Sequence, residues 1–444
     1  MGTNALPHLL ERRQLLKYGA AALGTHLLAG CGGGDDPLPD CQPIYDEAGQ
    51  WITDTCSHGS GEPTQGYFSV DGRQILKDGV PFFAQGVCYA PQPVGASFDF
   101  EPWGDFFTDF WDKVFMRDLP MMKKMGINTI RLYSTLPFRG IEAVAGAAQS
   151  HKKFLDACLD NGIFAWVGYP IDGGVFLNPK TKARVETGVK EIARQIGSHP
   201  AVMGFIMGNE ANLSSGFSAA ENRQVPIKSA PDFWAWIDKL GEVTKQQAPM
   251  KLTMTCLIDD SMESVDYAMQ FGGLPNIDVI GINSYRGNVT NGFDNLFSRF
   301  EELTRAHPHA LLITEFGCPA STRSGTAATE LPNNAKEQAD YISVHWQDIV
   351  KNKAVASGGY VFAWSDEWWK AGDPPVHNVK PETSRIDQFP GHYWDEEWFG
   401  IYSIQPDPRR KPSDPVNSDG SYYPDILTPR AAVAELTKLW TAAQ

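Results

Sequence analysis

Long apolar runs and positive charge are both scarce in this chain of 444 residues. The apolar stretch from Tyr18 to Leu28 is too short to span a bilayer, which takes roughly 20 apolar residues, and no other stretch approaches that length. Lys and Arg number 38 against 53 Asp and Glu, which gives a formal net charge of −15. Because clustered Lys and Arg are what bind a phosphate backbone, this balance argues against a nucleic-acid partner.

Cysteine and histidine patterns typical of metal sites are missing as well. The 7 Cys show no C-x-x-C motif, and His307 and His309 form a lone H-x-H that we interpret as surface or helix-end residues rather than metal ligands. The segment 86–90 lacks the G-x-G-x-x-G turn that binds dinucleotides. The sequence therefore predicts neither a metal nor a cofactor, while its apolar fraction of 42% is that of an ordinary globular chain.

The first residues of the chain have the pattern of an export signal. Arg12 and Arg13 precede the apolar stretch, as in twin-arginine (Tat) signals. Residues 28–31, Leu-Ala-Gly-Cys, resemble a bacterial lipobox, which implies cleavage before Cys31 and lipidation of its thiol. The alternative is an N-terminal helix with a chance Arg pair, but two signals in the right order favour export.

These signals predict how the chain is organised. We expect residues 1–30 to be a Tat-type lipoprotein signal peptide, residues 31–66 a tether, and residues 67–444 the folded domain. The protein is then exported to a bacterial cell envelope and meets the membrane only through a lipid on Cys31. The sequence leaves the oligomeric state and any disulfide pairing open.

After the tether, the chain alternates short apolar runs with helical patterns. Two turn signals, Asp71-Gly72 and Asp78-Gly79, predict an N-terminal β-hairpin. Eight apolar runs typical of strands covered on both faces are Pro81–Tyr89, Asn128–Tyr133, Phe164–Pro170, Val202–Glu210, Leu252–Leu257, Val279–Tyr285, Ala310–Phe316 and Gly358–Trp364. They predict an α/β fold, the (β/α)8 TIM barrel, with long loops on its catalytic face. A doubly wound open sheet competes, but the missing Gly-rich turn disfavours it.

A (β/α)8 barrel carries its chemistry at the C-terminal ends of its strands. The residues predicted there are Tyr89, Arg131, Tyr133, Tyr169, Asn209, Glu210, Cys256, Tyr285, Glu315 and Trp364. Two of them, Glu210 and Glu315, are carboxylates that follow buried strands, which costs desolvation energy unless they are partnered. Two carboxyls facing one pocket suit the cleavage of a glycosidic bond, because one gives a proton while the other stays ionised and attacks.

The pattern Asn-Glu after the fourth strand and Glu at the end of the seventh resembles the clan A (4/7) retaining glycoside hydrolases. The resemblance implies that Glu210 is the acid/base and Glu315 the nucleophile. It also implies supporting or substrate-binding roles at other strand ends: Asn209 on the sugar 2-hydroxyl, Arg131 and Tyr285 on the nucleophile, and Trp364 as the aromatic floor of the −1 subsite. Singly, each residue could be a helix cap, a rim ion pair or core, but six matching types at six strand ends favour the glycosidase interpretation.

Three segments carry a closer resemblance. They are similar to segments of the fungal β-1,3-glucanosyltransferases. The segments are residues 77–89, residues 116–133, which end in Asn-Thr-Ile-Arg-Leu-Tyr, and residues 314–318. Those enzymes carry Cys-rich C-terminal parts and a C-terminal lipid anchor, whereas this chain ends shortly after its last predicted helix. The match also overlaps β-galactosidase-like and β-mannosidase-like barrels.

The 13 Trp are unevenly distributed. Five fall between Trp364 and Trp398, at the end of the eighth strand and in residues 365–429, which are predicted to form a long irregular loop. Because aromatic faces suit sugar rings, we expect Trp368 and Trp369 to contact substrate, as do Tyr89 and Tyr133 at the strand ends. The alternative is that loop aromatics pack on one another, and we expect a mixture of the two.

These patterns predict a retaining β-glycoside hydrolase or transglycosylase that acts on an oligo- or polysaccharide, with β-glucan favoured. One alternative is an exo-acting enzyme like the β-mannosidases or β-galactosidases. Another, from a different class, is a non-catalytic glycan-binding envelope lipoprotein on a glycosidase scaffold. Binding alone has no need of two carboxylates with Arg131 and Tyr285 beside them, which favours an enzyme.

Overall fold

A computed structural model of the chain describes residues 43–45, 51–54, 67–96, 105–136, 150–171, 176–177, 179–218, 223–324, 327–377 and 385–442. Its contacts define two compact units, Met1–Cys56 and Ser57–Gln444. In the first unit, β1 (Pro43–Tyr45) and β2 (Trp51–Asp54) pair antiparallel. The predicted signal peptide, the predicted lipidation site Cys31 and most of the predicted tether lie outside the described residues.

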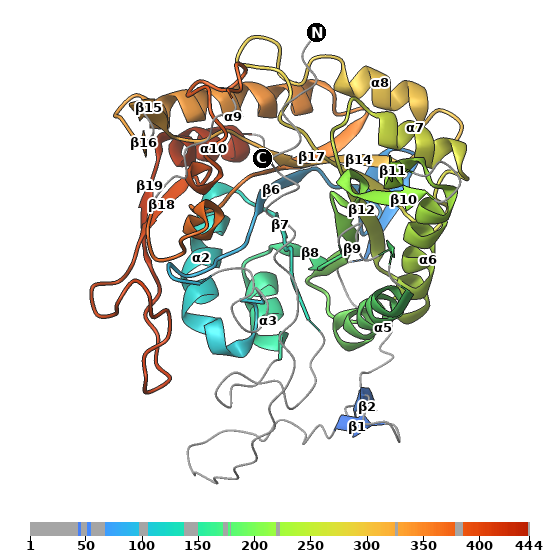
Figure 1. The fold of residues 1–444 in the computed structure, drawn as a ribbon, viewed down its shortest axis with the longest axis horizontal. Coiled ribbons are helices and arrows are strands. Elements are labelled where there is room, and N and C mark those ends of the chain that lie inside the picture. The colour runs from blue at the N-terminus through green and yellow to red at the C-terminus, as the bar shows by residue number, and fades with distance from the viewer. Residues whose placement is uncertain are drawn as a thin grey trace. The chain divides into compact units, whose positions relative to one another are not determined.

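The second unit contains a closed barrel of eight parallel strands (Figure 1). They are β6 (Ala84–Cys88), β7 (Thr129–Arg131), β8 (Phe164–Tyr169), β9 (Val202–Asn209), β12 (Leu252–Ile258), β13 (Val279–Asn283), β14 (Ala310–Phe316) and β17 (Ala356–Val361), and β17 pairs with β6 to close the ring. Each predicted apolar run overlaps one of these strands. The (β/α)8 prediction is therefore confirmed.

One described helix follows each barrel strand and lies outside the ring (Figure 1). These helices are α2 (Asp112–Met125), α3 (Lys152–Asp160), α5 (Pro179–Ile196), α6 (Pro231–Gln247), α7 (Glu263–Gln270), α8 (Leu296–Leu303), α9 (Asn334–Lys351) and α10 (Ala431–Thr441). Helix α5 shows why they dock. Its residues Val185, Val189, Ile192 and Ile196 share one face by their spacing and are all buried. No helix in the described ranges combines the length and apolarity of a membrane span.

The barrel interior is a second apolar core, distinct from the layer between strands and helices. It includes Met254, Leu312 and Tyr360. Gly86 makes room for the last of these, since a Cβ there would lie 2.3 Å from the Tyr360 ring. Strands with side chains alternating between two apolar environments explain why the sequence shows continuous apolar runs rather than alternation.

The predicted N-terminal β-hairpin is present and closes the bottom of the barrel. It is a sheet of β3 (Phe68–Asp71), β4 (Gln74–Lys77) and β5 (Val80–Pro81), with its turns at Gly72 and Gly79 in positive φ. The Phe68 ring packs edge-on against Phe164, the first residue of β8, with ring centroids 5.0 Å apart. The hairpin therefore covers the N-terminal ends of the strands and leaves the opposite end for chemistry.

The stretch 365–429 contains regular structure, contrary to the prediction of an irregular loop. It holds the 3-10 turns η6 (Trp368–Ala371) and η7 (Glu396–Trp398), and β18 (Tyr402–Gln405) pairs antiparallel with β19 (Ile426–Pro429). Arg430 ties the end of this stretch to its beginning, because its guanidinium binds Asp366 at 2.6 Å and Glu330 at 2.9 Å. Smaller antiparallel pairs follow β9 and β14: β10 (Ser215–Ser218) with β11 (Arg223–Pro226), and β15 (Thr322–Ser324) with β16 (Ala327–Thr329).

Candidate active site

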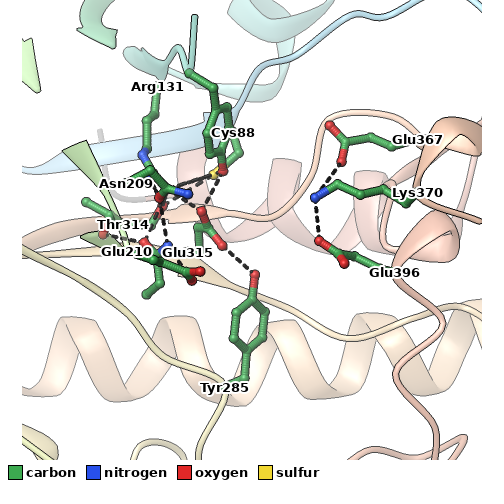
Figure 2. A network of polar contacts seen from close by, with 12 residues as sticks. Cys88, Arg131, Asn209, Glu210, Tyr285, Thr314, Glu315, Glu367, Lys370 and Glu396 are labelled. Atoms are coloured by element: carbon green, nitrogen blue, oxygen red, sulfur yellow. Dashed lines mark hydrogen bonds and ion pairs between the residues drawn. The ribbon is translucent and has the colours of Figure 1, made fainter. Parts of the chain in front are cut away.

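Glu315 lies near the C-terminal end of β14 and is held by three donors, of which Figure 2 labels Arg131 and Tyr285. Arg131 Nη1 lies 2.7 Å from Oε1, and the Tyr133 hydroxyl donates to the same oxygen at 2.8 Å. The Tyr285 hydroxyl donates to Oε2 at 2.8 Å. Glu315 is only 6% exposed, so these contacts replace the water that an exposed carboxylate would have.

The charge of Arg131 and the protons of Tyr133 and Tyr285 suit these residues to donate to the Glu315 carboxylate. Burial alone would lower the pKa of Arg131, but nearby Cys256, Tyr133 and Glu315 raise it well above its usual value, so the guanidinium stays charged. Burial raises the pKa of Tyr133 and of Tyr285 well above the usual value, and the charge of Glu315 adds to this. Both phenols therefore keep their protons and donate them to Glu315.

Glu210 follows β9 in an unusual backbone conformation. Its φ of 52° and ψ of 29° are left-handed, a region that a residue with a Cβ seldom adopts and that is found at functional sites. The backbone is held there by a hydrogen bond from the Glu210 N–H to the Cys256 carbonyl at 2.9 Å. The turn places Glu210 just after the strand. Its side chain is partly exposed there, whereas Glu315 is buried.

Asn283 links the two carboxylates and was missed in the sequence analysis. Its Nδ2 lies 2.9 Å from Glu210 Oε1 and 3.0 Å from Asn209 Oδ1. Asn209 Oδ1 also accepts from Arg131 Nη2 at 2.5 Å. The predicted residues Arg131, Asn209, Glu210 and Glu315 thus share one hydrogen-bond network. A signal existed, because Asn283 precedes Tyr285 by two residues and strand geometry places such residues on one side.

Tyr89 does not lie in this network, so its predicted contact with substrate is wrong. It is fully buried, and its hydroxyl donates to Asp118 of α2 at 3.0 Å. The preceding residue, Cys88, belongs to the interior core, and its Sγ lies 3.3 Å from the Thr314 carbonyl. Successive side chains of a strand point to opposite sides, so a prediction displaced by one residue selects the wrong face.

Trp364 also lies away from the carboxylates, which corrects its prediction as the aromatic floor. It is 1% exposed and packs on Tyr402, with ring centroids 4.6 Å apart. A tertiary contact explains this burial of Trp364. The Tyr402 N–H donates to the Trp364 carbonyl, which brings a segment distant in sequence against the strand end. The aromatic beside the site is Phe362, whose ring packs edge-on against Tyr285, with centroids 6.4 Å apart.

The two Trp residues predicted to contact substrate differ from each other. Trp368 is buried with Val94 and Ile404 and stacks on His377 with ring centroids 4.8 Å apart, so it is not available to a ligand. Trp369 is partly exposed, and the Lys370 ammonium lies 4.7 Å from its ring.

Trp394, which the sequence analysis did not select as a site residue, is nearer the carboxylates. It is partly exposed and packs edge-on against Tyr285, with centroids 4.6 Å apart. Other loop aromatics pack on one another, as Phe106 does on Trp111 at 5.1 Å. Packing between loop aromatics is therefore present in the described residues, and contact of the partly exposed ones with substrate stays a prediction.

No group of three or more His, Cys, Asp or Glu in the described part of the chain is arranged to hold a metal ion. The Arg131 and Asn283 side chains instead surround the carboxylates with N–H donors. Two acidic groups, one enclosed and one partly exposed, can divide the roles of an ionised nucleophile and a proton donor.

Comparison with known sequences gives fungal relatives. The chain is 24% identical over 254 residues to the 1,3-beta-glucanosyltransferase GAS2 of Saccharomyces cerevisiae, which covers 54% of this chain and 42% of the relative. It is 23% identical to a 1,3-beta-glucanosyltransferase of Arthroderma benhamiae, over 69% of this chain and 51% of the relative. The chain thus spans about half the length of these relatives. No family model matches the chain.

Solved structures share the fold. Saccharomyces cerevisiae Gas2p in complex with laminaripentaose aligns with a TM-score of 0.52 at 16% identity, covering 86% of this chain and 70% of that one. The β-D-glucuronidase of Dictyoglomus thermophilum aligns with a TM-score of 0.53 at 14% identity, covering 84% and 53%. The sequence relatives and the shared barrel together confirm the predicted resemblance: this chain is related to the β-1,3-glucanosyltransferases of the clan A glycoside hydrolases.

Proposed function

We propose that this protein is a retaining β-glycoside hydrolase or transglycosylase that acts on β-linked glucan by double displacement. Glu315 is the nucleophile and Glu210 the acid/base in this proposal. The observation that carries it is the difference between the two carboxylates within one network. Glu315 is enclosed by Arg131, Tyr133 and Tyr285, while Glu210 is partly exposed and accepts from the neutral amide of Asn283.

In the first step, an oxygen of Glu315 attacks the anomeric carbon and the bond from that carbon to the leaving oxygen breaks. Glu210 gives its proton to the leaving oxygen, so the departing sugar leaves as a neutral alcohol. Oε2 of Glu315 is the better placed oxygen, because it accepts one described hydrogen bond whereas Oε1 accepts two. Arg131 and Tyr133 on Oε1 hold the carboxylate in position during the attack.

In the second step, Glu210 takes a proton from water or from a sugar hydroxyl. The oxygen that loses the proton attacks the anomeric carbon, and the ester bond to Glu315 breaks to return the free carboxylate. Water gives hydrolysis, and a second glucan chain gives transfer. Two inversions at one carbon retain its β configuration.

Asn209 is suited to hold the sugar during both steps. Its Oδ1 accepts from both Arg131 and Asn283, so both lone pairs of that oxygen are used. Its amide NH₂ is then the group left for a substrate, and it donates to a hydroxyl of the ring bound at Glu315. The same network that fixes Glu210 thereby fixes Asn209.

The test is incubation with β-1,3-linked glucose oligosaccharides of defined length, followed by analysis of product lengths and of the first anomer formed. We expect β products, and products longer than the substrate where transfer competes with hydrolysis. Release of the α anomer first would contradict double displacement. A panel of mannans, galactans and uronides in the same assay tests the exo-glycosidase alternative, and the absence of turnover on every glycan would contradict an enzyme.

We also propose that the protein is exported and lipid-anchored at Cys31 of a bacterial envelope. The support is the order of Arg12, Arg13 and the Leu-Ala-Gly-Cys segment in the sequence, while the relatives named above are fungal. Mass spectrometry of the mature N-terminus and fractionation of cells producing Cys31→Ser test this. An unmodified N-terminus at Met1 in the wild-type protein would contradict the proposal.

A further inference from the structure

We propose that Glu367, Lys370 and Glu396 form a subsite that binds the hydroxyl groups of a neutral sugar ring next to the ring held at Glu315, and that selects against uronic acids. The inference rests on the proposed function and deepens it by naming a substrate class. None of these three residues was selected from the sequence. We call them the Glu–Lys–Glu cluster.

The cluster has a defined geometry on the catalytic face (Figure 2). Lys370 Nζ lies 2.5 Å from Glu396 Oε1 and 3.8 Å from Glu367 Oε2. Lys370 belongs to η6, which follows the end of the eighth barrel strand, and Glu396 belongs to η7. Two segments separated in sequence therefore meet through one ammonium group.

The cluster lies one aromatic ring away from the nucleophile. Lys370 Nζ is 5.6 Å from the centre of the Phe362 ring, and Phe362 packs against Tyr285, which donates to Glu315. The charge of Glu315 also contributes to the pKa shifts of both Glu367 and Lys370, in accordance with this proximity. A substrate ring next to the one at Glu315 would therefore lie beside the cluster.

Trp394 supplies an apolar surface between the Glu–Lys–Glu cluster and Tyr285, the residue that donates to Glu315. It packs against Tyr285 with centroids 4.6 Å apart, and its indole Nε1 donates to Glu396 Oε2 at 3.4 Å. Trp394 is partly exposed, as are the side chains of Lys370 and Glu396 at 22% and 25%. An aromatic face beside a few fixed donors and acceptors is the composition of a site for a sugar ring.

The charges of the cluster favour hydroxyl groups over carboxylates. Lys370 donates and Glu396 accepts, so the cluster can bind both the oxygen and the proton of a sugar hydroxyl. Because the ammonium of Lys370 is paired with the carboxylate of Glu396, the cluster leaves no net positive charge for a uronate. A carboxylate on the substrate would face Glu396 at close range, which is unfavourable.

A purely structural ion pair does not account for Glu367. Its side chain is 6% exposed, and Oε2 is buried with no hydrogen-bond partner among the described residues, at 3.8 Å from Lys370. Burying an acceptor without a hydrogen bond costs free energy, and such groups call for an explanation. A hydroxyl of a bound sugar would satisfy this oxygen.

The test compares wild type, Glu396→Gln and Lys370→Met on a β-1,3-glucose pentasaccharide and on an aryl β-glucoside with a single ring. Both variants should lower kcat/KM for the pentasaccharide by about tenfold or more, and lower it much less for the aryl glucoside, because only the longer substrate reaches the cluster. Glu435→Gln, which removes a partly exposed carboxylate 3.9 Å from Lys438 on α10, is the matched control.

Specificity gives a second measurement. Glu396→Gln should narrow the preference for the neutral pentasaccharide over a β-linked oligosaccharide containing glucuronic acid. Equal losses of kcat/KM on long and short substrates would overturn the subsite, because the cluster would then act through Glu315 or through the fold. Wild-type kcat/KM values in both variants would also overturn it. If wild type turns over no glycan, the proposed function fails. Calorimetric binding of the pentasaccharide to wild type and Glu396→Gln then decides the subsite independently, and equal affinities overturn it.

Discussion

The ends of β9 and β14 carry the same side chain in opposite surroundings. Glu315 on β14 is almost fully buried and accepts from one guanidinium and two phenols. Glu210 after β9 is partly exposed, sits on a left-handed residue and accepts from the neutral amide of Asn283. In the proposed mechanism, the position after a strand does not by itself decide the role of a carboxylate. Its donors do, because charged donors stabilise the ionised form and a neutral amide does so less.

The largest expected effect comes from removing the enclosed carboxylate. In the proposed mechanism Glu315→Gln cannot form the ester, so kcat on β-1,3-glucan should fall by more than about a thousandfold. The exposed Glu302→Gln on α8 is the control, since its side chain is 59% exposed. Activity within tenfold of wild type in Glu315→Gln would break the contrast drawn between the two strand ends.

Removing the other carboxylate should depend on the substrate. Glu210→Ala deletes the proposed proton donor, so turnover of glucan should fall by about 10²- to 10⁴-fold. Hydrolysis of an aryl β-glucoside with an acidic leaving group should fall less in its first step, because that leaving group departs without a proton. A loss in Glu210→Ala that is the same for good and poor leaving groups would rule out the acid role.

The two phenols on Glu315 provide a finer test. Tyr285→Phe removes the one described donor to Oε2, whereas Tyr133→Phe leaves Oε1 with Arg131. A hydrogen bond to a charged group contributes about 1.5–3 kcal/mol, so Tyr285→Phe should lower kcat by about tenfold or more, and Tyr133→Phe by less. If Tyr133→Phe has the greater effect, Oε2 is not the attacking oxygen.

The smallest expected effect concerns stability at a third carboxylate. Burial, with the charges of Glu396 and Glu315 and against that of Lys370, raises the pKa of Glu367 from 4.5 to about 8. A carboxyl that binds its proton more tightly when folded stabilises the protein below its ordinary pKa, and this stabilisation is lost as pH rises through the folded value. Between about pH 5 and pH 8, the Tm of wild type should therefore fall more steeply than that of Glu367→Gln.

Parallel Tm profiles for wild type and Glu367→Gln would show that Glu367 keeps its charge in the folded protein. It would then resemble Glu315, which has donors on both oxygens, and the contrast between satisfied and unsatisfied buried carboxylates would disappear. Glu435→Gln on α10, a partly exposed position, serves again as the control and should follow the wild-type profile.

The predictions made for residues at strand ends were correct or wrong according to what fixes each side chain's position. Arg131, Tyr133, Asn209, Glu210, Tyr285 and Glu315 lie in one network, because each follows directly from where a strand ends. Tyr89 failed by one residue of alternation, since Cys88 has the inward place. Trp364 failed because Tyr402, from a distant segment, packs on its ring. Asn283 could have been predicted from the sequence, because it precedes Tyr285 by two residues and so lies on the same side of the strand.

The sequence by itself determined the barrel, its eight strands and the two carboxylates, because apolar periodicity and the residues that end it are local properties of the chain. The loop contacts were decided by tertiary structure alone. Phe362 and Trp394 lie beside Tyr285, and Lys370 joins Glu367 to Glu396, only because segments far apart in sequence pack together after the eighth strand. Such contacts depend on which distant surface covers each side chain, and no local pattern of residues encodes that.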